Sequence, residues 1–223
     1  MEPMAPPRQM KIGTIIDKTL GVVEYSAAPV AMFVAGLTVV LAAVKYFTLG
    51  MGITEQLGSG LAQFVASLTA AYFLLDAMVR KTGLRSRTND DVFFAYIGLS
   101  ILYTLGVMAG LIALIIPGLV IMARWILAQP MMLARGDGVM QALGASWERT
   151  KGNEFQILIA MLALYVLPIA IVIACSALFD PADPVGIVVS QLASSAMSAL
   201  SLAMGVALFG LMEGAQATAS TFE

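Results

Sequence analysis

Arg124 is the residue whose type and position point most directly to chemistry. It lies in an otherwise apolar stretch from Gly110 to Trp125, about two turns after the pair Pro117 and Gly118. An arginine inside a membrane-spanning helix costs a few kcal/mol of insertion free energy, so it usually faces a protein interior, a cavity or a lipid headgroup. Two interpretations stay open. The side chain is either a structural anchor that snorkels or pairs with a carboxylate, or a site where the guanidinium binds a lipid phosphate or a substrate carboxylate.

Further basic residues follow in an amphipathic stretch at 137–151. Trp147 lies on its apolar side, and Arg149 and Lys151 come at its end. A tryptophan in such a stretch favours the membrane interface. The two cations are interpreted as a hydrated surface or, alternatively, as part of an anion site for a phospholipid headgroup together with Arg124.

The residue types that are missing exclude several kinds of catalyst. The chain has no histidine, and its one cysteine, Cys175, lies in an apolar run. Imidazole catalysis, histidine-ligated metals and an intrachain disulfide are therefore excluded. Asp76 stands four residues before Arg80, which predicts an ion pair along one helix face, with a proton relay as the alternative. We expect no catalytic residue, no metal, no cofactor and no enzymatic activity, because no nucleophile–base pair is visible.

The elements that position these residues must be helices in a lipid bilayer. The chain is 60% hydrophobic and 12% charged, whereas soluble proteins are about 45–50% apolar and about 25% charged. Its mean hydropathy is +0.90. The net charge of -2 gives no indication of a nucleic-acid partner. The composition predicts an all-α, polytopic transmembrane bundle.

Six apolar stretches are long enough to be predicted spans. They cover about 27–49, 61–79, 92–116, 119–134, 155–179 and 185–212. Pro117 and Gly118 are predicted to form the turn between the third and fourth spans, and Gly106 and Gly110 a face for close helix packing. The short fourth stretch either crosses the bilayer or forms a re-entrant segment, and the basic residues after it favour crossing.

The remaining segments organise the chain around these spans. Residues 1–8 are rich in proline and predicted to be disordered, and 9–223 form one membrane domain. Helices near residues 9–25 and 137–151 are amphipathic and are predicted to lie at the cytoplasmic interface. For the first of them, an ordinary solvated helix that caps the bundle is the alternative. The basic cluster at 80–87 places that loop in the cytoplasm, and both termini with it.

Small hydroxyl residues recur along one face of the last span. Ser190, Ser194, Ser198, Ser201 and Gly205 follow one another at intervals of three or four residues. In hydrocarbon such a stripe lets helices approach closely and share hydrogen bonds, so we interpret it as a packing face. A polar pathway is the alternative.

The block from Ile116 to Phe155 resembles a known family. It contains Ile-Pro-Gly, then an arginine helix that reaches a proline, and finally Ser-Trp-Glu-Arg-Thr-Lys-Gly. These motifs resemble the membrane domain of glycerophosphoryl diester phosphodiesterase and its bacterial YciC-like relatives. The matching residues are Ile116, Pro117, Gly118, Arg124, Pro130, Ser146, Trp147, Glu148, Thr150 and Gly152.

This resemblance implies a membrane module and not the accompanying hydrolase, which is a separate barrel that uses histidines, carboxylates and a divalent metal. The expected function is therefore a non-enzymatic module of the bacterial inner membrane that scaffolds a membrane or cytoplasmic protein partner or organises lipid, an anionic phospholipid included. The alternative is a small transporter or lipid-handling protein that uses the Pro-Gly break and Arg124.

Overall fold

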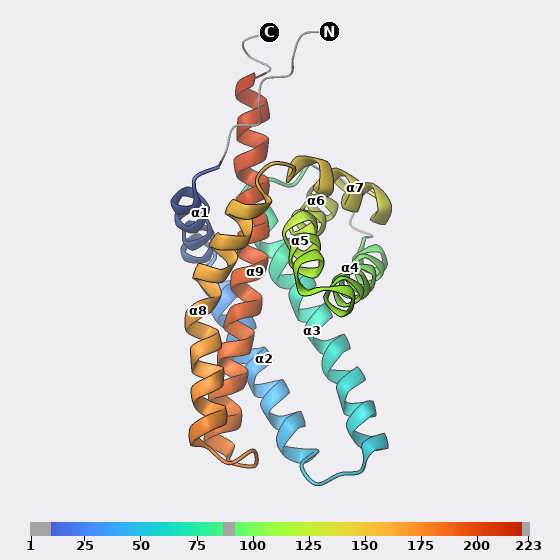
Figure 1. The fold of residues 1–223 in the computed structure, drawn as a ribbon, viewed down its shortest axis with the longest axis vertical. Coiled ribbons are helices and arrows are strands. Elements are labelled where there is room, and N and C mark those ends of the chain that lie inside the picture. The colour runs from blue at the N-terminus through green and yellow to red at the C-terminus, as the bar shows by residue number, and fades with distance from the viewer. Residues whose placement is uncertain (1–9, 87–91, 220–223) are drawn as a thin grey trace.

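A computed structural model describes residues 10–86 and 92–219, so the predicted disorder of 1–8 lies outside the described residues. The described part of the chain is helical throughout, without strands (Figure 1). Its helices are α1 (Ile12–Tyr25), α2 (Ala27–Phe47), α3 (Ile53–Lys81), α4 (Phe93–Ala113), α5 (Ile115–Trp125), α6 (Ala128–Arg135), α7 (Val139–Arg149), α8 (Glu154–Leu178) and α9 (Pro184–Ala219).

Six helical stretches are long and apolar enough to cross a membrane. This confirms the all-α bundle with six stretches of the length and composition predicted for spans. The structure differs mainly at the ends of helices: α3 begins at Ile53 rather than near residue 61, because nothing in the intervening segment stops a helix from extending beyond the apolar core. α9 begins sharply at Pro184, where the Asp183 carboxylate accepts hydrogen bonds from two backbone N–H groups of the first turn.

The long helices α2, α3, α8 and α9 extend to the end of the molecule opposite the termini (Figure 1). By contrast, α4 and α5 form a hairpin that runs across the direction of these four helices, nearer the terminal end (Figure 1). The tip of this hairpin is strongly apolar and exposed. Ile112, Leu114, Ile115 and Ile116 each expose about 70% or more of their surface. Hence the α4–α5 hairpin presents an apolar edge to the bilayer.

The turn of this hairpin lies three residues earlier than predicted. Leu114 is extended, with φ -165° and ψ 145°, and α5 begins at Ile115. The prediction that Pro117 and Gly118 form the turn is therefore wrong. Pro117 fits inside the first turn of α5 because the first N–H groups of a helix have no intrahelical acceptor, so the missing N–H of proline costs nothing there.

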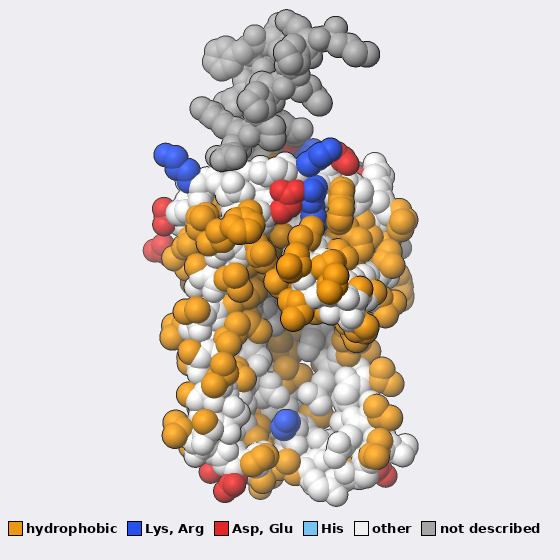
Figure 2. Space-filling view, viewed as in Figure 1, with side chains coloured by type: hydrophobic (Ala, Val, Ile, Leu, Met, Phe, Trp, Pro, Cys, Tyr) orange, Lys and Arg blue, Asp and Glu red, His pale blue; other side chains and the backbone are white. Residues whose placement is uncertain are grey.

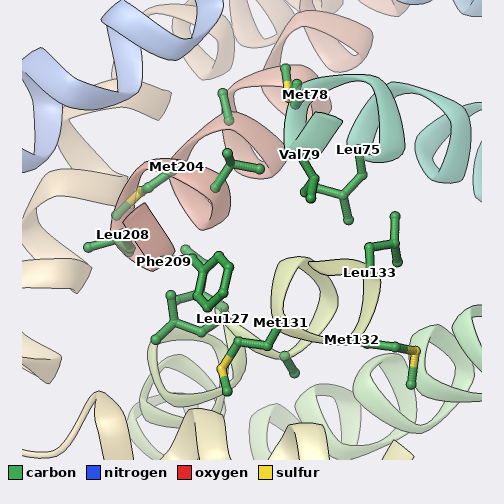
Figure 3. Packing of buried hydrophobic residues seen from close by; sticks show 14 of the residues in the cluster. Leu75, Met78, Val79, Leu127, Met131, Met132, Leu133, Met204, Leu208 and Phe209 are labelled. Atoms are coloured by element: carbon green, nitrogen blue, oxygen red, sulfur yellow. The ribbon is translucent and has the colours of Figure 1, made fainter. Parts of the chain in front are cut away.

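The predicted fourth span, 119–134, is divided between α5 and α6. Ile126 and Leu127 form a turn between them, because Pro130 has no N–H to donate to the Ile126 carbonyl and its ring crowds that oxygen. The short helix α6 lies in the core, with Met131, Met132 and Leu133 fully buried. Figure 3 shows side chains of this segment among those of α3 and α9.

The two amphipathic helices are both present, α1 near the N-terminus and α7 after α6. Both lie in the half of the molecule from which the termini leave (Figure 1). On the visible face, most charged side chains also gather near that end (Figure 2). Ile15 and Thr19 are the buried residues of α1, as expected for a helix with one apolar face.

Candidate functional site

Arg124 at the end of α5 is enclosed by side chains and backbone from α7 and α8. Its Nη2 atom pairs with the Glu154 carboxylate, and its Nη1 donates a hydrogen bond of 2.9 Å to the Trp147 carbonyl oxygen. The guanidinium also stands 4.9 Å from the centre of the Trp147 ring, in cation–π contact. Only 13% of the arginine side chain is exposed. Its positive charge is thus neutralised inside the protein.

The backbone of Arg124 is held by the same segment. Its carbonyl oxygen accepts hydrogen bonds from the Ser146 hydroxyl at 2.6 Å and the Thr150 hydroxyl at 3.2 Å. Positions 146, 147 and 150 meet at one place because residues four apart share a helix face. We call Arg124, Ser146, Trp147, Thr150 and Glu154 the Arg124 clamp.

A glycine brings Glu154 back to this clamp. Gly152 has φ 84°, a left-handed conformation that glycine adopts without strain, and it reverses the chain between α7 and α8. Glu154 then begins α8, close to the arginine on α5. Sequence reasoning foresaw a carboxylate partner for Arg124 without identifying it. The available signal was a carboxylate in the first turn of an apolar span, two residues after the glycine.

The clamp favours a structural role for Arg124. A phosphate approaching the guanidinium must compete with the Glu154 carboxylate, which already forms a charge-assisted bond. The Nε of Arg124 is buried and has no hydrogen-bond partner among the described residues. One donor in this position does not form the bidentate fork that phosphate recognition by arginine uses.

Of the two cations predicted to share an anion site with Arg124, Arg149 pairs with a different carboxylate from that of Arg124. Arg149 Nη1 lies 2.8 Å from a Glu213 carboxylate oxygen, which also pairs with Arg135. This carboxylate joins the ends of α6 and α7 to α9. Lys151 is exposed. An anionic phospholipid at these residues remains a prediction.

Asp76 forms the predicted ion pair with Arg80, at 2.6 Å. Arg85 approaches the same carboxylate at 3.9 Å. These two contacts join the end of α3 to the loop after it, which favours a structural role for Asp76. The cavity of the bundle, described next, is not lined by Asp76, Arg80 or Arg85.

That cavity was not foreseen from the sequence. It has a volume of about 280 Å³ and lies beneath the α4–α5 hairpin, between α3 and α9. Figure 2 shows a hollow below the apolar side chains of that hairpin. The lining residues that carry polar side-chain atoms are Ser67, Tyr96, Ser100, Tyr103, Thr104, Trp125, Gln129, Ser198 and Ser201. No charged side chain among the described residues lines it.

Residues 94–222 match the family described as the membrane domain of glycerophosphoryl diester phosphodiesterase, and this region is more than half of the chain. The chain belongs to this family. The match does not distinguish YciC-like relatives within it, so that part of the prediction stays a prediction. No curated protein and no solved structure matches the chain.

The matched part of this membrane domain contains α4 to α9 and therefore the whole Arg124 clamp. The motif residues Ser146, Trp147 and Thr150 are those that contact Arg124. The motif is thus accounted for by packing between α5, α7 and the start of α8. Unlike the Arg124 clamp, the cavity is not contained in the matched region, because α2 and α3, which lie outside that region, supply part of its wall.

The serine stripe of this membrane domain serves two purposes. The hydroxyls of Ser194 and Ser198 donate to carbonyl oxygens of the preceding helical turn, at 2.9 and 3.1 Å. Gly205 lets α9 approach the α5–α6 turn, since a Cβ there would lie 2.9 Å from the Ile126 carbonyl oxygen. This supports the packing interpretation. Ser198 and Ser201 also line the cavity, which leaves the polar alternative open for that part of the stripe.

No metal site is found within the described residues, where no three potential ligands among histidine, cysteine, aspartate and glutamate come together. The buried Cys175 is a free thiol.

Proposed function

We propose that this chain is a non-enzymatic membrane module that organises lipid or holds a membrane partner. The observation that carries the proposal is the Arg124 clamp, in which the most suggestive side chain of the sequence is already paired with Glu154 and Trp147. A catalytic or transport site would need that charge to be available to a ligand. The match to the membrane domain of this family over residues 94–222 supports the membrane part of the proposal.

A small transporter or lipid-handling protein is the second candidate. The observation that favours it is the turn at Ile126 and Leu127, which interrupts a membrane helix beside the cavity, as interrupted helices do at the binding sites of many transporters. Substrate binding there would depend on Gln129 and the neighbouring hydroxyls rather than on Arg124.

Assays of product formation and of flux in a defined bilayer distinguish these two candidates. The full chain in nanodiscs is incubated with phospholipids and glycerophosphodiesters, and products are followed by mass spectrometry, with proteomics on the same purified sample. We expect no product, together with bound lipid or a partner in stoichiometric amount. Product that increases with time and protein concentration, and disappears after heat denaturation, would contradict the proposal. Flux across proteoliposomes that requires Gln129 would favour the second candidate.

We also propose that the module lies in the bacterial inner membrane with both termini in the cytoplasm. Of the lysines and arginines among the described residues, Lys45 alone lies near the far end of the long helices. The positive-inside rule favours a cytoplasmic position for the opposite, basic end. Lys45 lies in the last turn of α2.

Single cysteines report both this orientation and the depth of the α4–α5 hairpin. In a Cys175→Ala background, Met51→Cys in the α2–α3 loop should react with a membrane-impermeant maleimide added outside spheroplasts. Leu114→Cys at the hairpin tip should react from neither side, because the tip ends within the bilayer. Labelling of Leu114→Cys from outside would mean that α4 crosses fully. Labelling of Met51→Cys only after lysis would reverse the orientation.

A further inference from the structure

The cavity beneath the α4–α5 hairpin has an uneven distribution of polar groups. Its polar side is formed by Ser100, Thr104 and Gln129, from α4 and α6. Gln129 Nε2 donates to the Ser100 hydroxyl at 3.3 Å, and Thr104 donates to the Ser100 carbonyl oxygen at 2.8 Å. These groups form a connected polar surface that we call the cavity roof, since the hairpin covers it.

The walls below this roof carry mainly apolar side chains, with the hydroxyls of Ser67, Ser198 and Ser201 among them. Phe33 and Leu37 on α2, Phe64 and Leu68 on α3, and Leu202 on α9 line them. The space is partly open, as the hollow in Figure 2 shows. It adjoins helices that are long and apolar enough to cross a membrane, and beside such helices hydrocarbon is the expected medium. Water does not compete well for such a space, whereas an acyl chain fits its walls.

Charge determines which amphiphile suits the roof. No lysine, arginine, aspartate or glutamate of the described residues lines the cavity. An ionised phosphate at the roof would lose its hydration with no cation to compensate, which opposes its binding. An uncharged ester or hydroxyl loses far less, and hydroxyl and amide groups satisfy its hydrogen bonds.

We propose that this cavity binds one molecule of an uncharged glycerolipid of the diacylglycerol class. Its free hydroxyl and esters lie at the Gln129–Ser100 roof, and one acyl chain lies along the phenylalanine and leucine walls. The volume of about 280 Å³ is near the lower end of the range for ligand sites. The cavity therefore encloses the polar group and the first part of a chain, and the rest of the lipid stays in the bilayer.

The inference rests on the proposed lipid-organising function and gives it a ligand class. It also reverses the expectation of an anionic phospholipid, because the basic residues that would bind one pair with carboxylates or lie outside the cavity. In this arrangement the hairpin separates the cavity from the charged terminal end of the molecule (Figure 1).

The test uses the full chain in nanodiscs of phosphatidylethanolamine and phosphatidylglycerol. Equal small amounts of diacylglycerol and phosphatidic acid with identical acyl chains are added, and the lipids retained after detergent extraction are measured by mass spectrometry. We expect retention of diacylglycerol to exceed that of phosphatidic acid by about tenfold or more, as expected for the cost of an unpaired buried charge. Equal retention of the two lipids would overturn the proposal.

Three variants locate the binding. Ser67→Phe places a ring in the cavity without removing a group of the roof, and it should abolish the preference for diacylglycerol. Ala62→Phe, on an exposed part of the same helix that does not line the cavity, should retain it. Gln129→Leu keeps the side-chain size but removes the amide, so it should reduce diacylglycerol retention even if Ser67→Phe fails to fold. Unchanged retention in Gln129→Leu would contradict the assignment of the roof.

Failure of the cavity proposal can be distinguished from failure of the proposed function. If the chain retains no uncharged lipid but also forms no product, the cavity assignment is wrong and the non-enzymatic module stands. If product forms, the module is wrong whatever the cavity binds.

Discussion

Replacing Gly118 with alanine is expected to destabilise the folded protein by about 3 kcal/mol, the upper part of the usual range for overpacking. A Cβ at this position would lie 2.5 Å from Leu111 Cγ and 2.7 Å from the backbone nitrogen of Leu111. A flexible side chain can move aside, but the backbone of α4 cannot do so without separating the two helices. The contact is reciprocal, because a Cβ at Gly110 would lie 2.8 Å from Gly118 Cα.

The sign of this effect is informative because alanine normally favours a helix. An alanine in a helix interior is about 0.5–1 kcal/mol more favourable than glycine. Gly36 in α2 is the matched control, since a Cβ there meets nothing within 4 Å. Gly36→Ala should therefore leave stability unchanged or raise it slightly.

The free energy of unfolding of both variants can be compared by titration with sodium dodecyl sulfate, using intrinsic fluorescence to follow the folded fraction. If Gly118→Ala unfolds at the same detergent fraction as Gly36→Ala, the close packing of α4 on α5 does not exist in the membrane. Gly110→Ala provides an independent test, since it removes the same contact from the other helix.

The helices were predictable because apolar length alone largely determines membrane spans. A backbone in lipid must satisfy its own hydrogen bonds, so an apolar stretch of about 20 residues has few alternatives to a helix. The close-packing face of Gly106 and Gly110 was also readable from its spacing. The structure confirms it: a Cβ at Gly106 would collide with the Trp125 ring, and Gly110 lies against Gly118.

The path of the chain between the helices was less predictable. The residue types of Pro117 and Gly118 predict a turn. However, proline is also common in the first turn of a helix, and glycine is also common where two helices pack closely. Whether Gly118 forms a turn or a helix contact depends on Leu111, which packs against it from α4. Hydropathy also does not indicate whether an apolar hairpin runs along the bundle or across it.

The cavity could not be predicted because its wall combines α2, α3, α4, α5, α6 and α9, segments from nearly the whole chain. Ser100 and Gln129 carry no sequence signal of a site, since single polar residues in spans are common at helix contacts. Their meeting depends on the turn at Ile126 and Leu127, which rotates the residues after it into the core.

Replacing Arg124 with methionine is expected to destabilise the protein by about 3 kcal/mol or more, because it leaves the Glu154 carboxylate without its partner. The side chains of both residues are largely enclosed, with 13% and 27% exposed. Glu154→Gln should cost a similar amount, since the guanidinium then keeps only the Trp147 carbonyl and ring. The double variant should recover part of the loss, giving a coupling energy well above that of a surface pair.

Arg80→Met is the matched control for this loss of an arginine. Arg80 also pairs with a carboxylate, that of Asp76, but its side chain is 56% exposed. Because solvent screens such a pair, its removal should cost about 1 kcal/mol or less. The same detergent titration gives the free energy of unfolding for each variant. If Arg124→Met is no more costly than Arg80→Met, the clamp does not stabilise the fold and the guanidinium is free to bind an anionic ligand. Loss of bound anionic lipid in that stable variant would then favour the lipid-handling protein over the passive module.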